Sequence, residues 1–326
     1  MDCIPINEFE LNAKIEGFYL IKSLKCKTSS NNSKFMDFLL SDKTGEINAK
    51  LWNCSEDDEA KYVQNTLVKV RGVVGEWQNQ LQLKIEKIRL STAADDIDAA
   101  DFVQTAPYNA EYMYNQLLDY TSKINNHDIR MIVSHILKDH KQKLMTFPAA
   151  MKNHHAIRSG LLYHIMTMLM TAEKLSEIYT FINTDLLFGG VILHDIAKIY
   201  EMDANDLGMV SEYTCEGQLL GHIIQAIKMI ETTAKKLNAD TEISVLLQHM
   251  ILSHHYEPEF GSPKKPMFPE AELLHYIDLI DSRMYDMKKA LENISEGSFS
   301  DRIWSLENRK VYKYSLYDEN EEKSLA

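Results

Sequence analysis

The chain has 326 residues, of which 45% are hydrophobic and 25% are charged, a composition typical of a globular protein of about two domains. This composition excludes an intrinsically disordered chain and a fibrous repeat protein. The formal net charge of −13 argues against a protein that binds polyanions over its whole surface. Residues 1–90 are neutral, with 13 basic and 13 acidic side chains, so the excess negative charge lies in the rest of the chain.

No stretch approaches the roughly 18 uncharged apolar residues that a membrane helix needs. The first residues, MDCIPINEFE, are acidic where a signal peptide would be basic and then apolar. The four cysteines are scattered and form no CxxC pair, so we expect reduced thiols. These features together predict a cytoplasmic protein without a membrane partner.

The first 92 residues alternate between apolar and polar side chains, as β-strands do. Five strands with a helix between the third and the fourth follow the order of an OB-fold barrel, which commonly binds single-stranded nucleic acid. We therefore predict an OB-fold nucleic-acid-binding domain over residues 1–92. The expected strands span residues 14–26, 34–41, 46–52, 67–77 and 81–90, and the expected helix spans residues 56–65.

Alternation sorts the aromatic residues of the barrel into core and surface. Phe35 shares a strand face with Asp37, whereas Phe38 points the other way, so we expect Phe35 to be exposed and Phe38 to be buried. Exposed aromatic rings near a lysine suit base stacking beside a phosphate contact. The alternative is that these aromatic residues all belong to the barrel core. The candidate nucleic-acid contacts are Phe35, Lys50, Trp52 and Trp77.

After a small, acidic linker the hydrophobic period changes to about 3.6 residues, which is typical of helices. We expect a linker and helical connector over residues 93–150, an all-α domain over 151–298 and a tail over 299–326. Residues 311–317 form either a strand or an ordered tail, and residues 318–326 have the composition of a disordered end. The expected fold is thus an OB barrel followed by an all-α helical bundle.

The dipeptide His194-Asp195 lies in the apolar run LLFGGVILHDIAKIYEM, whose pattern would bury one helical face. A buried imidazole and a buried carboxylate are costly unless both have partners, and metal coordination supplies them. Lys198 lies one helical turn further on the same surface. A lone buried histidine is more often a hydrogen-bonded core residue, but further ligand-capable side chains interrupt apolar helical faces elsewhere. These side chains, which separate helices of a bundle can carry, are His164, His222, His254, His255 and Asp278.

The order H…HD…H…HH…D, with HDIAK at its centre, resembles the HD-domain superfamily of metal-dependent phosphohydrolases. An OB fold followed by FPAAMKNHHAIRSGLLYH and LSHHYEPEFGSPKKPMFPEAELLHYIDLIDSRM is similar to the YhaM family of 3′-to-5′ exoribonucleases. Three residues depart from the family pattern and bear on substrate preference. Ser159 replaces the first glycine of a GGLLEH-like motif, Tyr163 replaces its acidic residue, and Tyr256 replaces the glycine after the histidine pair.

The resemblance implies a two-metal centre and assigns its residues. Imidazole and carboxylate ligands suit Mn²⁺, Fe²⁺ or Zn²⁺ better than Mg²⁺ or Ca²⁺, and the family points to manganese. Asp195 and Lys198 are the expected catalytic residues, the lysine at the developing phosphoryl charge, and Asp281 is expected to orient a ligand histidine. His255 is a further ligand or a substrate contact, and His155 is a substrate contact or a packing residue. The implied ligands are His164, His194, Asp195, His222, His254 and Asp278.

The remaining histidines and lysines near this motif have ordinary structural alternatives. His154 also precedes the helix of His164, where a substrate contact and packing at the helix entry stay open. We expect His249 and His275 to pack beside the ligands. Lys264 and Lys265 either guide RNA or lie in a solvated loop.

The sequence therefore predicts a metal-dependent 3′-to-5′ exoribonuclease that hydrolyses single-stranded RNA to nucleoside 5′-monophosphates, with single-stranded DNA as a second candidate substrate. Two alternatives stay open. One is an HD-type nucleotide phosphohydrolase or cyclic-dinucleotide phosphodiesterase, which the OB barrel disfavours. The other is a non-catalytic RNA-binding regulator, which the intact ligand set disfavours. The resemblance also suggests a homo-oligomer.

Overall fold

The computed structural model describes residues 4–29, 33–78, 80–95, 97–98, 101–151, 155–292 and 294–316. The chain folds into two compact units, of which the first ends at Thr105 and the second begins at Ala106. Each unit has its own hydrophobic core. Within the described ranges, no helix is long and apolar enough to cross a bilayer.

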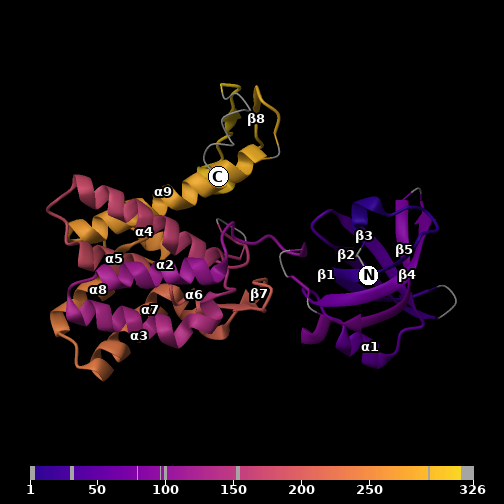
Figure 1. Cartoon of the computed structure of the whole chain (residues 1–326), viewed down its shortest axis with the longest axis horizontal. Coiled ribbons are helices and arrows are strands. Elements are labelled where there is room, and N and C mark those ends of the chain that lie inside the picture. Colours follow the sequence, from indigo (N-terminus) through magenta and orange to yellow (C-terminus); the bar gives the residue numbers. More distant parts are fainter. Residues whose placement is uncertain are drawn as a thin grey trace. The chain divides into compact units, whose positions relative to one another are not determined.

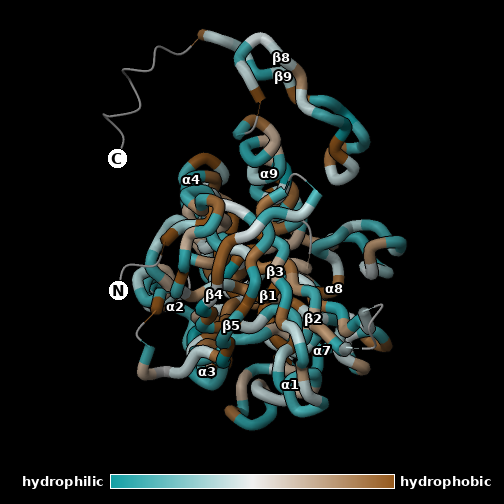
Figure 2. The backbone as a smooth tube through the Cα atoms, turned by 90° about the vertical axis from the view of Figure 1, so that its right-hand side faces the viewer, coloured by the Kyte–Doolittle hydropathy of each residue, from teal (hydrophilic) through white to brown (hydrophobic). Residues whose placement is uncertain are grey.

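The first unit is a closed five-stranded β-barrel, which confirms the predicted OB-fold architecture (Figure 1). Around the barrel the strands follow the order β1-β2-β3-β5-β4; β3 and β5 are parallel and the other neighbouring pairs are antiparallel. Alternate apolar side chains such as Tyr19, Phe38 and Leu83 fill the interior, and Figure 2 shows bands of brown and teal along the strands. The strands are β1 (Lys14–Thr28), β2 (Lys34–Ser41), β3 (Glu46–Trp52), β4 (Leu67–Trp77) and β5 (Gln80–Leu90).

One helix separates β3 from β4, as the sequence predicts. α1 (Glu56–Lys61) begins at Ser55, whose hydroxyl accepts a hydrogen bond from the backbone N–H of Asp58 while the Asp58 carboxylate accepts one from the backbone of Ser55. The helix ends earlier than expected because Tyr62 is buried in the barrel core. Its hydroxyl donates to the carbonyl oxygen of Ile88, 2.8 Å away.

Gly72 and Gly75 of β4 lie at different distances from the backbone of β5. A Cβ atom added at Gly72 would lie 2.3 Å from the carbonyl oxygen of Lys84, whereas one added at Gly75 would lie 3.7 Å from that of Gln82. We expect Gly72→Ala to lower the free energy of unfolding by about 1–3 kcal/mol, because the backbone of β5 must shift. Gly75→Ala should change it by no more than about 0.5 kcal/mol. Urea unfolding followed by tryptophan fluorescence measures both, and equal stabilities would contradict the close approach.

The second unit is a helical bundle, as predicted (Figure 1). Five of its helices begin at residues whose side chains accept hydrogen bonds from backbone N–H groups of the first turn, namely Asn109, Asn126, Asn183, Thr214 and Asp240. The helices are α2 (Ala110–Lys123), α3 (His127–Leu144), α4 (Gly160–Ile178), α5 (Thr184–Leu193), α6 (Lys198–Glu201), α7 (Cys215–Leu237), α8 (Thr241–Ser253) and α9 (Pro269–Glu292).

Short strands and 3₁₀ turns complete the two units. A hairpin of β6 (Met202–Ala204) and β7 (Val210–Tyr213) joins α6 to α7 and was not expected, because such short strands show too little alternation to detect. The segment expected to be a strand or ordered tail contains β9 (Tyr312–Lys313), which pairs with β8 (Ser298–Phe299). The expected disordered end lies outside the described residues. The 3₁₀ turns are Ile6–Glu8, Ala93–Asp95, Pro258–Phe260 and Trp304–Leu306.

α5 lies at the centre of the helical core. Every residue from Leu186 to Leu193 is buried, and α5 contacts α2, α3, α4, α8 and α9. A helix that is apolar on all sides is stable only when it is surrounded by protein. α2 and α3, which fall in the predicted connector, belong to this same core. The carboxyl end of α5 therefore lies inside the bundle, and the residues that directly follow it are buried as well.

Candidate active site

α5 delivers His194 and Asp195 into the core of the bundle. His194 is fully buried and Asp195 is 2% exposed. Nδ1 of His194 donates to the carbonyl oxygen of Val191, 2.8 Å away. Nε2 of His194 consequently faces the other side, where it lies 3.2 Å from Nε2 of His164 on α4.

The Asp195 carboxylate lies between two groups of imidazoles. Its Oδ2 is 3.4 Å from Nε2 of His194 and 3.7 Å from Nε2 of His164. Its Oδ1 is 3.3 Å from Nε2 of His222 on α7 and 3.9 Å from Nε2 of His254 at the end of α8. One carboxylate thus borders two adjacent positions, each with its own imidazoles.

Asp278 and His255 complete the two groups. Oδ1 of Asp278, on α9, lies 3.4 Å from Nε2 of His164. The ligand atoms of Asp195, His222, His254 and His255 lie within 4.8 Å of one another. The structure therefore brings together all the candidate ligands from five helices, and it places His255 beside three of them.

Hydrogen bonds on the outer side of each ring fix which nitrogen faces the centre. Nδ1 of His254 and Nδ1 of His255 each donate to a backbone carbonyl oxygen 2.7 Å away. Nδ1 of His164 lies 2.7 Å from Oδ2 of Asp281. Imidazoles held in this way present the lone pair of Nε2 to a metal ion.

Glu201 holds His222 in the same manner and is not among the site residues that the sequence predicts. Its Oε1 accepts hydrogen bonds from Nδ1 of His222 at 3.1 Å and from the backbone N–H of His222 at 3.0 Å. Gly221, with a φ of +67°, bends α7 just before His222. The available signal was the spacing in HDIAKIYE, which puts Glu201 six residues after Asp195.

Buried atoms without partners test whether these residues fit a metal ion. Oδ1 of Asp195, Nε2 of His222 and Nε2 of His254 are buried and have no hydrogen-bond partner in the part of the chain that the structure describes. Each such atom costs about 1–3 kcal/mol, and a divalent cation would take lone pairs from all three. The donor set fits such an ion, and its many imidazoles suit Mn²⁺, Fe²⁺ or Zn²⁺ better than Mg²⁺ or Ca²⁺.

Burial and neighbouring charge shift the pKa values of several candidate ligands. Burial lowers the pKa of His164, but the carboxylates of Asp278 and Asp281 outweigh it and raise this pKa to about 10. Burial alone raises the pKa of the Asp195 carboxyl, but the Lys198 ammonium together with the imidazoles of His194 and His222 outweighs it and holds this pKa well below its usual range. Nζ of Lys198 lies 2.6 Å from Oδ2 of Asp195. Burial lowers the pKa of His254 well below its usual value, so this imidazole is neutral at pH 7. A contact of Lys198 with a phosphoryl group stays a prediction.

His155 does not lie at the surface. Only 1% of it is exposed, and its Nε2 is 2.7 Å from Oδ2 of Asp281. The structure therefore places this candidate substrate contact behind a candidate ligand, His164. His154 lies outside the described residues.

His249 and His275 each form a hydrogen bond with the backbone. Nδ1 of His275 donates to the carbonyl oxygen of His254, 2.7 Å away, and Nε2 of His249 accepts from the backbone N–H of Met267 at 3.0 Å. Nζ of Lys265 lies 4.4 Å from the ring centroid of Tyr256. Guidance of RNA by Lys264 and Lys265 stays a prediction.

The barrel gathers its four candidate nucleic-acid contacts into one cluster. Nζ of Lys50 lies 5.5 Å from the ring centroid of Phe35, 5.9 Å from that of Trp52 and 5.6 Å from that of Trp77. Trp52 is 41% exposed and Trp77 is 59% exposed. We call these four residues the aromatic–lysine cluster.

The prediction that Phe35 is exposed is wrong. Phe35 is only 8% exposed, because it pairs with Trp52 across β2 and β3 and the two rings stack with centroids 4.8 Å apart. Alternation predicts on which face of a strand a side chain lies, but not which neighbouring side chain covers it. Trp52 and Trp77 are therefore the rings that this cluster offers to a ligand.

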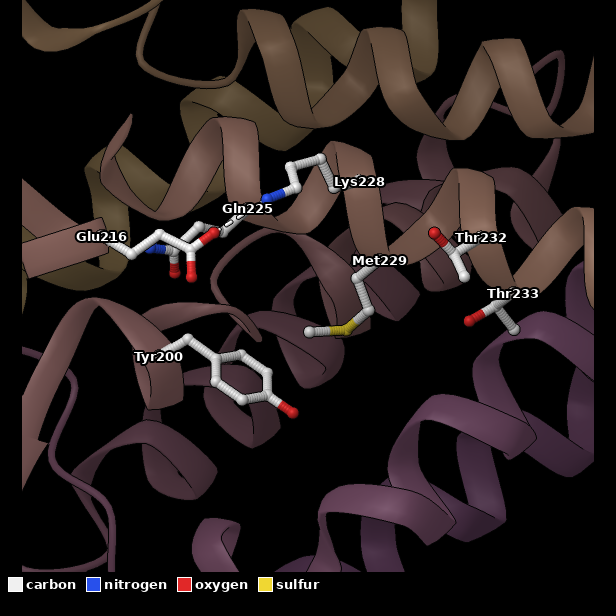
Figure 3. A pocket seen from close by; sticks show the side chains of 7 residues that line it. All are labelled: Tyr200, Glu216, Gln225, Lys228, Met229, Thr232 and Thr233. Atoms are coloured by element: carbon white, nitrogen blue, oxygen red, sulfur yellow. Dashed lines mark hydrogen bonds and ion pairs between the residues drawn. The ribbon is translucent and has the colours of Figure 1, made fainter. Parts of the chain in front are cut away.

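A groove of about 320 Å³ is lined by Tyr200 of α6 and by residues of α7 on both sides of His222 in the sequence (Figure 3). Glu216 and Lys228 form an ion pair of 2.8 Å across its wall. It holds none of the candidate ligands, so we assign the chemistry to the histidine and aspartate centre instead. The groove is lined by Tyr200, Glu216, Gln225, Lys228, Met229, Thr232 and Thr233.

Sequence comparisons match both units. The model of the OB-fold nucleic acid binding domain matches residues 20–91, and that of the HD domain matches residues 161–283. The 3′-5′ exoribonuclease YhaM of Geobacillus sp. (strain WCH70) is 44% identical over 309 residues, which cover 94% of this chain and 94% of that protein. The chain belongs to the YhaM family. All six implied ligands fall within the range matched by the HD domain.

Further YhaM-family relatives have similar coverage. The 3′-5′ exoribonuclease YhaM of Halalkalibacterium halodurans is 41% identical and covers 95% of this chain and 96% of its own length. That of Bacillus subtilis (strain 168) is 40% identical and covers 94% of this chain and 97% of its own length. The expected family resemblance is confirmed across both units.

Metal binding should stabilise the helical unit. At about 100 times its Kd, each Mn²⁺ ion should add about 2.7 kcal/mol to the free energy of unfolding. We expect Asp195→Asn to lose this gain, because the carboxylate that borders both positions is gone, while His127→Ala, at an exposed histidine outside the centre, keeps it. Thermal melts of the metal-free protein with and without Mn²⁺ measure the shift. A shift that survives Asp195→Asn would place the metal elsewhere.

Proposed function

We propose that the chain is a metal-dependent 3′-to-5′ exoribonuclease that shortens single-stranded RNA and releases nucleoside 5′-monophosphates. The observation that carries this proposal is the Asp195 carboxylate buried between two groups of imidazoles. Membership of the YhaM family supports the direction and the substrate. The aromatic–lysine cluster supports single strands, whose bases stack on exposed rings.

The proposed ligands divide around Asp195 into two sets, and we propose Mn²⁺ for both positions. His164, His194 and Asp278 lie on the Oδ2 side of Asp195. The Oδ1 side is bordered by the imidazoles of the second set, where we propose that His255 acts as a ligand and not as a substrate contact. Two divalent ions held there would polarise a phosphoryl oxygen and lower the pKa of a water molecule.

The protein side chains have separate parts in the reaction. Hydrolysis breaks the bond between phosphorus and the 3′ oxygen; the oxygen of water stays on phosphorus and a proton goes to the leaving 3′ oxygen. Asp195 remains ionised because Lys198 lies 2.6 Å from it. We propose that the Lys198 ammonium also faces the phosphoryl group, where a fixed cation stabilises developing negative charge.

The direct test uses single-stranded RNA labelled at either end. With Mn²⁺, 5′-labelled RNA should give a ladder of shortening products, and 3′-labelled RNA should release labelled mononucleotide first. Asp195→Asn should lower the rate at least about 100-fold, because even the loss of an outer partner of a metal ligand costs up to that much. His127→Ala should retain the parental rate, and a single-stranded DNA lane tests the second candidate substrate.

Other results of the same assay would contradict the proposal. Hydrolysis confined to mononucleotides or cyclic dinucleotides would identify a small-nucleotide enzyme. Tight RNA binding without hydrolysis under any divalent metal would identify a regulator.

Self-association and a cytoplasmic location stay predictions, and light scattering of the full chain tests the first of them.

RNA affinity should depend on the rings of the aromatic–lysine cluster. We expect Trp77→Ala to weaken binding by about 5- to 150-fold, since each stacked base contributes about 1–3 kcal/mol. The control is Trp304→Ala, which removes another exposed tryptophan, 74% accessible, from the helical unit. Fluorescence anisotropy of labelled RNA, measured in the Asp195→Asn background, gives both affinities. Equal losses in the two variants would argue against a specific role of the barrel.

A further inference from the structure

Asp281 joins two imidazoles through one oxygen atom. Its Oδ2 lies 2.7 Å from Nδ1 of His164 and 2.7 Å from Nε2 of His155. His164 is a proposed metal ligand, and its other nitrogen faces Asp195 and Asp278. A side chain that touches no metal position is thus linked to the centre through a single carboxylate.

Two tyrosines hold the ring of His155 in place. The ring centroid of Tyr285 lies 4.0 Å from that of His155, and Tyr163 packs against the same ring edge to face at 5.1 Å. Tyr285 stands one turn after Asp281 on α9, and Tyr163 directly precedes His164 on α4. The ring of His155 is therefore packed by residues adjacent to the two groups it links.

The backbone of His155 is fixed as well. Its φ is +53°, in the left-handed region, and its carbonyl oxygen accepts a hydrogen bond from the backbone N–H of Ala149 at 3.1 Å. A Cβ atom added at Gly160 would lie 2.0 Å from that carbonyl oxygen. Such close backbone contact leaves residue 155 little freedom to turn toward solvent.

We propose that His155 is a positioning residue that holds Asp281 and thereby sets the tautomer and orientation of His164. An ionised carboxylate oxygen only accepts hydrogen bonds, so each of the two rings carries its hydrogen on the nitrogen that faces Asp281. In its neutral form, which a metal ion would require, His164 then has its hydrogen on Nδ1 and the lone pair of Nε2 directed at the centre. The inference rests on the proposed function, because it names the support of one of the proposed ligands.

The hydrogen bond from His155 restricts the rotation of the Asp281 carboxylate. Without that donor, Asp281 can rotate away from His164, and the ring of His164 loses a defined direction. Partners of this kind typically contribute 10- to 100-fold to metal affinity. The consequence differs from that of a substrate contact, because metal binding changes before any RNA is present.

Two variants of the full chain separate the hydrogen bond from packing. Both His155→Leu and His155→Gln remove the ring that Tyr285 contacts, but glutamine keeps an N–H donor near the place of Nε2. We expect His155→Leu to bind Mn²⁺ about 10- to 100-fold more weakly and His155→Gln to recover most of this affinity. Titration calorimetry of the metal-free proteins measures the affinity, and the visible absorption of bound Co²⁺ reports ligand geometry. Circular dichroism and metal-free melts compare the folding of the variants.

Equal Mn²⁺ affinities in the leucine and glutamine variants, whether parental or reduced, would overturn the proposal, because the donor would then have no effect. A raised KM for RNA at unchanged Mn²⁺ affinity would also overturn it and would make His155 a substrate contact. The parent protein decides the proposed function separately. If the parent binds Mn²⁺ and shortens RNA while His155→Leu equals it in both, only the positioning role fails.

Discussion

The helical unit depends on the burial of one carboxylate, that of Asp195. Moving an ionised carboxylate out of water costs several kcal/mol unless opposite charge and hydrogen bonds replace the water. Lys198 supplies part of that replacement at 2.6 Å, on the Oδ2 side. Oδ1 has no hydrogen-bond donor in the described ranges and faces imidazole nitrogens instead. The arrangement is unfavourable for a structural core but suits the binding of cations, which explains why so many helices direct polar groups to one point.

The position of Asp195 follows from the helix that precedes it. Because α5 is apolar on every side, it packs only at the centre of the bundle, and the residues after its last turn are buried with it. The surrounding helices can then each contribute one ligand from a buried face. Glu201 and Asp281 form hydrogen bonds that orient two of the rings, so the proposed metal centre would include acids that touch no ion. The orientation of the candidate ligands therefore depends on how the residues around them pack.

Local pattern predicts part of this arrangement. The barrel strands and the candidate ligands are visible in sequence because alternation identifies strand faces and because histidines interrupt apolar helical faces, as His164 and His222 do. Contacts between distant residues are not visible. The cover that Trp52 places over Phe35 depends on strand register, and the bond between His155 and Asp281 joins residues 126 positions apart. Such pairs follow from the packing of complete elements, so no local spacing identifies them.

Backbone geometry bears on two of the departures from the family pattern that the sequence predicts. Ser159 and Tyr256 stand where the family resemblance predicts glycines, and both have a positive φ, of +60° and +68°, which costs a residue with a side chain about 1–2 kcal/mol. Each side chain provides a compensating contact. The Ser159 hydroxyl donates to the carbonyl oxygen of Met145 at 2.6 Å, and the Tyr256 ring packs on that of His275 with centroids 4.8 Å apart. These contacts help to hold two left-handed turns that glycine would adopt without strain, one just before the helix of His164 and one just after His255.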